Sequence, residues 1–328
     1  MNPESTTMRI IFFGTPVFAA AHLEYLVQNG HEIAAVVTAP DKPAGRGKQL
    51  QESAVKKTAM QSGIPVLQPL KLKDPVFVQQ LQILQADLFI VIAFRMLPEI
   101  VWKLPAKGTF NLHASLLPNY RGAAPINRAI MNGETETGLT TFLINEDIDT
   151  GHIIKQIRLP IGENETAGEL HDKMIQKGCT LVEETILLLS QAGTSAVPQS
   201  AFVSDFDALK PAPKLYKEDG KINWNKNGRE IHNLIRGLSP YPGSYTRFVS
   251  ENGELMELKL YKSRFEETAH DKTHFTLLTD NRTYAKVALE GGFLFLDELQ
   301  QSGKKNLPIE AFLNGFKFHG IWKADLMF

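Results

Sequence analysis

An asparagine and a histidine stand two residues apart in a predicted strand, residues 109–113. In an extended chain alternate side chains share a face, so Asn111 and His113 point to one side and Leu112 to the other. Together they offer a hydrogen-bond donor and a titratable imidazole to one reacting atom. A lone histidine near an apolar strand is usually structural, but an amide beside it on the same face favours a reacting centre.

A carboxylate completes the candidate set. Asp149 lies in the turn-like sequence Asp147-Ile-Asp-Thr-Gly151, which follows another predicted strand. Acyl transfer from an amide-like donor to an amine needs a donor to the oxyanion, a proton acceptor and a carboxylate that orients the imidazole. Asn111, His113 and Asp149 could supply these three groups. Asp149 could also be a turn or helix-cap residue, and spacing alone leaves both interpretations open.

Strand and helix patterns alternate before this region and after it. The predicted strands are residues 9–13, 32–38, 87–94, 109–113 and 139–144, and the predicted helices are residues 17–29 and 166–189. Residues 87–94 indicate a strand buried on both faces, as in a parallel sheet. The second helix begins with a capping box, Thr166-Ala-Gly-Glu169. We therefore expect a doubly wound α/β domain in residues 1–190, with Asn111 and His113 at a carboxyl strand end, where such sheets bind ligands.

The composition changes after that domain. Residues 191–213 are rich in small and polar side chains and prolines, which predicts a linker. One short helix begins near Asn227 in the remaining part, residues 214–328. Five short strand patterns follow, at residues 244–249, 255–263, 274–279, 284–289 and 293–299. Asn252-Gly253 and Gly291-Gly292 suit tight hairpins between neighbouring strands. We expect a small β-barrel.

Bulk composition excludes several classes of function. The 35 basic and 36 acidic side chains leave a net charge of −1, so nucleic-acid binding would require a local patch. The single cysteine, Cys179, excludes an internal disulfide and predicts a buried structural thiol. The longest apolar run, residues 88–94, is too short to span a membrane. The nine histidines form no ligand-spaced cluster, so we expect no metal. We expect a cytoplasmic protein, acting as a monomer.

Longer motifs surround the candidate residues. Asn111-Leu-His113, Ser115-Leu-Leu-Pro-Asn-Tyr-Arg-Gly122 and Asp149-Thr-Gly151 occur in this order, and the sequence resembles the folate-dependent formyltransferases. It is similar to the members that act on tRNA along nearly its whole length, including Phe13-Gly-Thr-Pro-Val-Phe-Ala19 and residues 40–48 and 214–224. The resemblance implies a Rossmann-like formyl-transfer domain followed by an OB-like barrel.

The resemblance also implies substrates and site residues. The formyl donor would be 10-formyltetrahydrofolate, and the acceptor would be the amino group of methionine on initiator tRNA. The residues implied to be catalytic are Asn111, His113 and Asp149. The residues implied to contact folate are Ser115, Leu116, Leu117 and Pro118, together with the loop residues Arg95, Met96 and Leu97. That loop, Ala93-Phe-Arg-Met-Leu-Pro98, is shorter than is usual in members acting on tRNA and looks more like that of glycinamide ribonucleotide formyltransferase.

A basic loop carries the tRNA prediction. Residues 41–48 contain Lys42, Arg46 and Lys48 against one acid, Asp41, and proline and glycine exclude a regular helix or a central strand there. The resemblance implies that this loop contacts the acceptor end of tRNA. A solvated loop without a partner is the alternative. An amino sugar or a glycinamide nucleotide could replace tRNA as acceptor, and a nucleic-acid-binding protein with an inactive enzyme fold is a third possibility.

Overall fold

The computed structural model describes residues 8–44, 49–191, 193 and 195–328. It divides into two units, each built from separate stretches of the chain. The first unit consists of the described residues of Met1–Gly122, Gly138–Leu159 and Asp172–Pro211. The second consists of Ala123–Thr137, Pro160–His171 and Ala212–Phe328.

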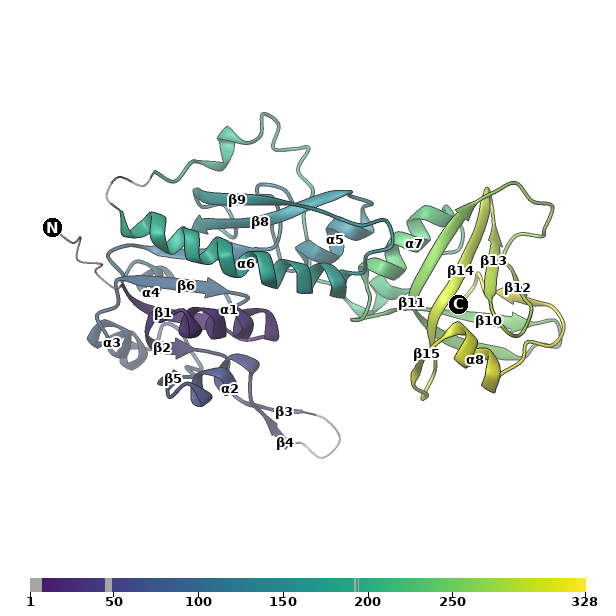
Figure 1. Cartoon of the computed structure of the whole chain (residues 1–328), viewed down its shortest axis with the longest axis horizontal. Coiled ribbons are helices and arrows are strands. Elements are labelled where there is room, and N and C mark those ends of the chain that lie inside the picture. The colour runs from purple at the N-terminus through teal and green to yellow at the C-terminus, as the bar shows by residue number, and fades with distance from the viewer. Residues whose placement is uncertain (1–7, 45–48, 192, 194) are drawn as a thin grey trace. The chain divides into compact units, whose positions relative to one another are not determined.

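A seven-stranded sheet forms the centre of the α/β part (Figure 1). Its order is β5 (Val66–Leu67), β2 (Glu32–Val37), β1 (Arg9–Gly14), β6 (Leu88–Ile92), β7 (Thr109–His113), β8 (Glu136–Leu143) and β9 (Ile153–Pro160). The pairings from β5 through β7 are parallel, and β8 is antiparallel to β7. β6 is buried at every position, as expected for a central parallel strand. The sequence had not indicated β9, or β5 at the far edge.

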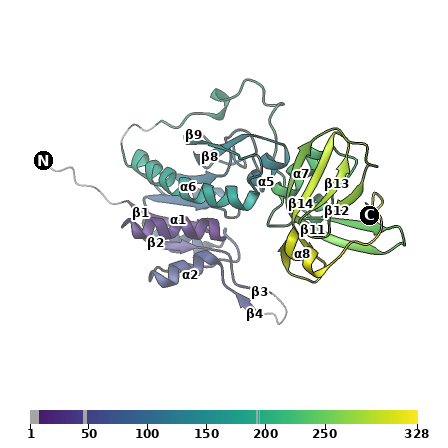
Figure 2. The same ribbon diagram turned by 45° about the vertical axis from the view of Figure 1, so that its right-hand side comes forward.

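Helices cover both faces of this sheet. The helices α1 (Val17–Gln28) and α6 (Ala167–Ser190) lie side by side on one face (Figures 1 and 2). Gly178 permits this close approach, because a Cβ there would lie 2.5 Å from His22 Nε2. The other face packs against α3 (Pro75–Ile83) and α4 (Glu99–Trp102), and its core contains Phe13, Phe89 and Val91. Helix α2 (Ala54–Gln61) completes this part.

A separate two-stranded hairpin follows β2. Its strands are β3 (Lys42–Ala44) and β4 (Gln49–Gln51), and they pair with each other alone. Asp41 fixes the base of the hairpin, because its carboxylate accepts hydrogen bonds from Lys56 and from Gln68, the latter at 2.8 Å. These two hydrogen bonds hold the pKa of Asp41 below its ordinary value.

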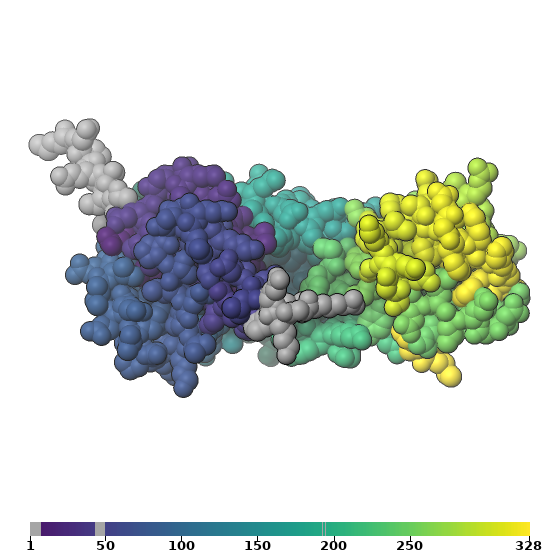
Figure 3. Space-filling view, turned by 90° about the horizontal axis from the view of Figure 1, so that it is seen from below, coloured from purple at the N-terminus to yellow at the C-terminus, as the bar shows by residue number. Residues whose placement is uncertain are grey.

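A closed six-stranded antiparallel barrel forms most of the second unit. Its strands are β10 (Ser244–Ser250), β11 (Leu255–Glu267), β12 (Thr276–Thr279), β13 (Ala285–Leu289), β14 (Gly292–Gln301) and β16 (Trp322–Ala324). Pairing of β11 with β14 closes the ring, and β15 (Asn306–Pro308) extends it beside β14. Trp224 and Phe248 are among its largest buried side chains. In the space-filling view, the light-green and yellow residues of the barrel form one continuous surface (Figure 3).

Three further helices belong to this unit: α5 (Pro125–Met131), α7 (Gly228–Gly237) and α8 (Ile309–Gly315). The predicted capping box at Asn227 is present at the start of α7. The parallel-type α/β domain and the small β-barrel confirm the predicted fold class. The five predicted barrel strands are present, and the sixth, β16, had not been predicted.

Candidate active site

Asn111 and His113 occupy the carboxyl end of β7. Asn111 pairs with Val91 of β6, so it shares the sheet face that carries α3 and α4, while Leu112 turns towards α6. The two side chains therefore lie on one face, as predicted. His113 is buried, with 7% of its surface exposed, and Asn111 is half-buried.

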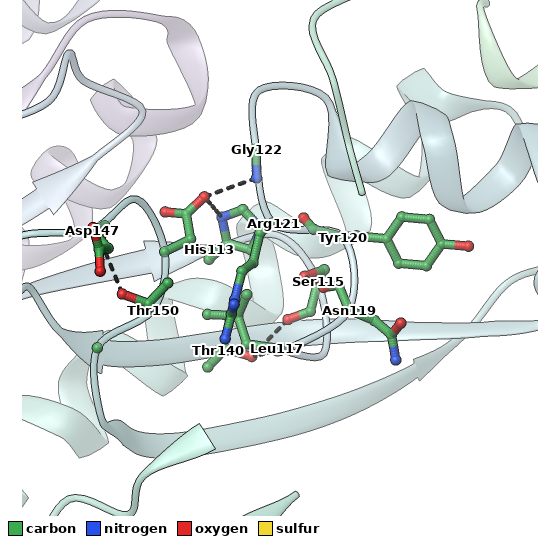
Figure 4. Close-up of polar contacts among 12 residues, drawn as sticks. His113, Ser115, Leu117, Asn119, Tyr120, Arg121, Gly122, Thr140, Asp147 and Thr150 are labelled. Carbon is green, nitrogen blue, oxygen red and sulfur yellow. Dashed lines mark hydrogen bonds and ion pairs between the residues drawn. The ribbon is translucent and has the colours of Figure 1, made fainter. Parts of the chain in front are cut away.

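Asp149 reaches this strand end from the loop between β8 and β9. Its Oδ2 lies 3.7 Å from His113 Nδ1 and accepts a hydrogen bond of 2.9 Å from the Gly122 backbone N–H (Figure 4). His113 Nε2 lies 2.8 Å from the Tyr120 carbonyl oxygen. A carbonyl only accepts, which assigns a proton to Nε2 and leaves Nδ1 facing the carboxylate. The structure thus brings His113 and Asp149 together.

Left-handed backbone conformations shape the loops around this pair. Asp149 has φ +55° and Tyr120 has φ +61°, and Ala93, which follows β6, has φ +47°. Residues other than glycine rarely adopt these backbone angles. Such strained positions persist where surrounding contacts hold them. All three lie at carboxyl strand ends or in the loops beside them, where an open α/β sheet places its ligands.

The predicted folate stretch 115–118 is held by contacts with β8 and β9. The Ser115 hydroxyl donates to the Asn119 carbonyl at 2.7 Å, and its own carbonyl accepts from Thr140 at 2.7 Å. Gln156 donates to the Leu117 carbonyl at 2.8 Å. Ser115, Leu117 and Pro118 are buried and Leu116 is half-buried. Their contact with folate stays a prediction.

A cavity of about 550 Å³ opens beside the loop that contains Arg95, Met96 and Leu97. All three residues line it, and its other lining residues are Lys71, Leu72, Lys73, Pro98, Glu99, Trp102 and Glu146. The Arg95 guanidinium donates to the backbone carbonyls of Pro69 and Leu70. These hydrogen bonds tie the loop to residues 69–70, and the cavity beside it has both apolar and charged lining residues.

The predicted tRNA residues are only partly described. Lys42 is exposed at the start of β3, where it pairs with Gln51. Arg46 and Lys48 lie outside the described residues.

Two residues with a clear structural place at the site had not been singled out. Arg121 and Gln199 hydrogen-bond to each other beside Asp149, with Arg121 Nε 3.1 Å from Gln199 Oε1. Arg121 belongs to the motif that carried the resemblance, but Gln199 stands in a polar stretch whose composition carries no signal.

Metal binding and membrane crossing are two other properties on which the described residues bear. In the part of the chain that the structure describes, no group of three or more His, Cys, Asp or Glu side chains is arranged to hold a metal ion. Among the described helices, none combines the length and apolarity needed to cross a bilayer.

The arrangement suits acyl transfer. Asn111 can donate to an oxygen that gains charge, and His113 can hold a proton on Nδ1 beside a carboxylate. The His113–Asp149 separation of 3.7 Å exceeds a hydrogen bond, so the two groups are adjacent without being locked together.

Comparison with known proteins gives matches to both parts of the chain. The family described as "Formyl transferase" matches residues 8–186, and the one described as "Formyl transferase, C-terminal domain" matches residues 214–317. A methionyl-tRNA formyltransferase of Parabacteroides distasonis is 50% identical over 94% of this chain and 96% of that protein. A methionyl-tRNA formyltransferase of Flavobacterium johnsoniae is 46% identical over 95% of this chain and 97% of that protein.

Solved structures share the fold. WlaRD, a sugar 3N-formyl transferase solved with dTDP and 5-N-formyl-THF, has a TM-score of 0.64 at 21% identity, over 92% of this chain and 100% of that chain. HypX from Aquifex aeolicus, in complex with tetrahydrofolic acid, has a TM-score of 0.62 at 17% identity, over 94% of this chain and 47% of that chain. The family matches and the near full-length relatives place the chain: it belongs to the formyl transferase family of one-carbon transfer enzymes.

Proposed function

We propose that this enzyme transfers the formyl group of 10-formyltetrahydrofolate to the amino group of methionyl initiator tRNA. The product would be N-formylmethionyl-tRNA, which begins translation. The observation that carries this proposal is the 50% identity, over nearly the full length of both chains, to a protein named methionyl-tRNA formyltransferase. We place the reaction in the cytoplasm and assign it to a single chain.

The transfer proceeds directly, without a covalent enzyme intermediate. The neutral amine attacks the formyl carbon, and the carbonyl π electrons move to oxygen to give a tetrahedral oxyanion. When the oxyanion collapses, the bond from carbon to N10 of the folate breaks. The amine loses a proton and N10 gains one, so tetrahydrofolate and the N-formyl amide leave as neutral groups at the reacting atoms.

Three side chains assist these steps. Asn111 donates to the oxyanion, which is typically the largest single contribution in acyl transfer. His113 carries the transferred proton on Nδ1, because Nε2 already holds a proton that it donates to the Tyr120 carbonyl. Asp149 orients His113 and stabilises positive charge on it, and the 3.7 Å between Asp149 Oδ2 and His113 Nδ1 supports this assignment as an ion pair.

The folate occupies the cavity beside Arg95, Met96 and Leu97. Its volume and its apolar lining from Leu72, Leu97 and Trp102 suit a flat heteroaromatic ring such as the pterin. The Ser115–Pro118 stretch begins two residues after His113 and so contacts the folate near the formyl group. The hydrogen bonds of Ser115 and Leu117 to Thr140 and Gln156 support a preformed site.

The tRNA contacts two parts of the chain. Lys42 of β3 contacts the acceptor end, together with Arg46 and Lys48 from the basic sequence that follows it. Residues 214–328, with the closed barrel, bind the body of the tRNA. The near-neutral chain means that these contacts come from local patches.

An acceptor comparison tests the proposed function. The enzyme is mixed with 10-formyltetrahydrofolate and, separately, methionyl initiator tRNA, the same tRNA uncharged, an amino sugar nucleotide and glycinamide ribonucleotide. We expect formylated product with methionyl-tRNA alone, detected by mass spectrometry of the released amino acid. Formylation of one of the small acceptors, with none of methionyl-tRNA, would contradict the proposal.

A further inference from the structure

A polar segment after α6 returns to the active site. This return segment, residues 195–211, runs back along the outside of β9 and β8 (Figures 1 and 2) and belongs to the first unit. Val197 forms an antiparallel bridge with Ile153 at the start of β9, with two hydrogen bonds of 2.8 Å. Neither family match includes it, since they end at residue 186 and begin at residue 214.

Gln199 is the buried residue of this segment. It is 3% exposed, whereas the other described residues between 191 and 211 are exposed or half-buried. Its Nε2 donates to the carbonyls of Asp149 at 2.8 Å and Gly151 at 2.9 Å. Its Oε1 accepts from Arg121 Nε at 3.1 Å and Nη2 at 2.5 Å. Both donors and both acceptor sites of the amide are therefore satisfied.

The partners of Gln199 carry the reacting groups. Arg121 is flanked by Tyr120, whose carbonyl faces His113 Nε2, and by Gly122, whose N–H donates to the Asp149 carboxylate. One buried amide thus joins the loop that positions His113 to the loop that bears Asp149. Figure 4 shows Arg121 in the first of these loops, next to Tyr120 and Gly122. It binds the backbone on either side of Thr150, directly at a residue with φ +55°.

The rest of the return segment holds the other end of the same loop. The Tyr120 N–H donates to the Lys210 carbonyl at 2.6 Å, and the Lys210 N–H donates to Asn119 Oδ1 at 3.1 Å. The Arg121 guanidinium also lies 5.9 Å from the centre of the Phe206 ring. Tyr120 has positive φ, so these contacts hold a second backbone position that is unfavourable in isolation.

We propose that Gln199 is a positioning residue for formyl transfer, which sets the distance between Asp149 and His113 through Arg121 and the Asp149 backbone. Its amide contacts the backbone of Asp149 and neither the Asp149 carboxylate nor the His113 ring, so its loss should slow transfer and leave folate binding intact. The inference rests on the proposed function for its assay. A displacement of about 1 Å at a reacting centre can cost on the order of 100-fold in rate.

Gln199→Met tests this role, because methionine has a similar length and lacks the amide. Single-turnover transfer to methionyl-tRNA is measured for the parent, Gln199→Met and the matched control Gln191→Met, whose residue is exposed. We expect Gln199→Met to be about 10- to 100-fold slower with its folate Kd within about threefold of the parent, and Gln191→Met to match the parent. Transfer by Gln199→Met at the parental rate would overturn the proposal.

A double-mutant cycle separates positioning from a general loss of structure. Residues that act through one another give non-additive effects. In an Asp149→Asn background we therefore expect Gln199→Met to slow transfer by less than about threefold. An equal slowing in both backgrounds would show that Gln199 acts elsewhere, and would overturn the proposal.

Two further experiments cover a variant that does not fold and a parent that does not use methionyl-tRNA. If Gln199→Met does not fold by circular dichroism, Arg121→Met removes the same link from its other end, and the same non-additivity with Asp149→Asn is expected; additive effects contradict the proposal. If the parent does not formylate methionyl-tRNA, the proposed function fails on its own. The cycle is then run with the acceptor that the parent does formylate, with the same expected and contradicting results.

Discussion

The carboxylate of Asp149 is held on one side by the Gly122 N–H and faces His113 on the other. Asp149→Asn keeps this shape and removes the charge that stabilises a proton on His113 Nδ1. We expect formyl transfer to slow by on the order of 100-fold or more, with a normal melting temperature. The measurement is single-turnover transfer beside thermal unfolding. A near-parental rate would leave Asp149 as a turn residue only.

The single cysteine has a different character. Cys179 is buried in α6, and burial raises the pKa of its thiol to about 11. Because the thiolate is the reactive form, we expect slow modification by iodoacetamide at pH 8 in the native enzyme and fast modification in urea. Cys179→Ser, which has no thiol, provides the blank for this assay. Rapid native inactivation that folate prevents would instead place the thiol at the active site.

Single residues also show how far sequence reasoning reaches. The alternation of a strand was enough to put Asn111 and His113 on one face, since their spacing is local. The link from Gln199 to Arg121 joins positions 78 residues apart, so no local pattern contains it. The resemblance supplied the motif around Arg121, but composition predicted only a linker where Gln199 stands. Such a contact depends on the tertiary structure, in which the return segment packs against β9.

At the scale of an element, the start of α6 connects sequence and stability. The Thr166 N–H donates to Glu169 at 2.9 Å and the Glu169 N–H donates to Thr166 Oγ1 at 3.2 Å, so the predicted capping box is present. The Thr166 backbone hydrogen bond, then the ion pair with Lys262, lowers the pKa of Glu169 from 4.5 to about 2. A lowered folded-state pKa stabilises the fold above pH 4.5, and this contribution is lost as the pH falls towards 2.

Glu169→Gln should therefore show a pH-dependent cost. We expect it to lower the free energy of unfolding at pH 7 by less than about 1 kcal/mol, because half of the side chain is exposed to solvent. The difference from the parent should shrink between pH 4.5 and pH 2. Urea unfolding at pH 7 and pH 3 measures it, with the exposed Glu290→Gln as control. An equal cost at both pH values would show that the charge of Glu169 is not the cause.

Other elements show where the sequence pattern alone does not predict a strand. β10 has the alternation that its burial requires, since it is buried at every second position, whereas β13 and β14 each contain three buried residues in a row. β16 has three residues and pairs with β10 and β12, so its signal is too short to distinguish from a loop. The hairpin of β3 and β4 is held by Asp41 and Lys56, a contact between a loop and a helix. Proline and glycine excluded a central strand there, and the two short strands pair outside the main sheet.

At the scale of the whole molecule, the units do not follow the order of the chain. Residues 123–137 and 160–171 belong with the barrel, and Asn127 of α5 donates to the Gly237 carbonyl at 2.7 Å. Buried Arg236 donates to the carbonyls of Gly162 and Glu165 at 3.2 and 3.0 Å. Composition along the sequence could not indicate this interleaving, because the partners are more than 70 residues apart.

The charge of the whole chain leads to a prediction about salt. A net charge of −1 gives no general attraction for tRNA, so affinity must come from a small number of phosphate contacts. Lys42→Ala should weaken tRNA binding and reduce the slope of log affinity against log salt by about one unit, with no effect on folate affinity. Filter binding at salt concentrations from about 50 to 200 mM measures this slope. The exposed Lys57→Ala variant is the matched control. Equal slopes for Lys42→Ala and the parent would remove Lys42 from the tRNA interface.

The central claim is that Asn111, beside His113 and Asp149, stabilises the oxyanion of a direct formyl transfer. Single-turnover transfer from 10-formyltetrahydrofolate to methionyl-tRNA by Asn111→Ala tests it most directly, because this variant removes the donor and leaves the imidazole and the carboxylate in place. We predict a rate lower by on the order of 10²–10⁴, with folate and tRNA affinities within about threefold of the parent. A correctly folded Asn111→Ala enzyme that transfers formyl within about threefold of the parental rate would contradict the account.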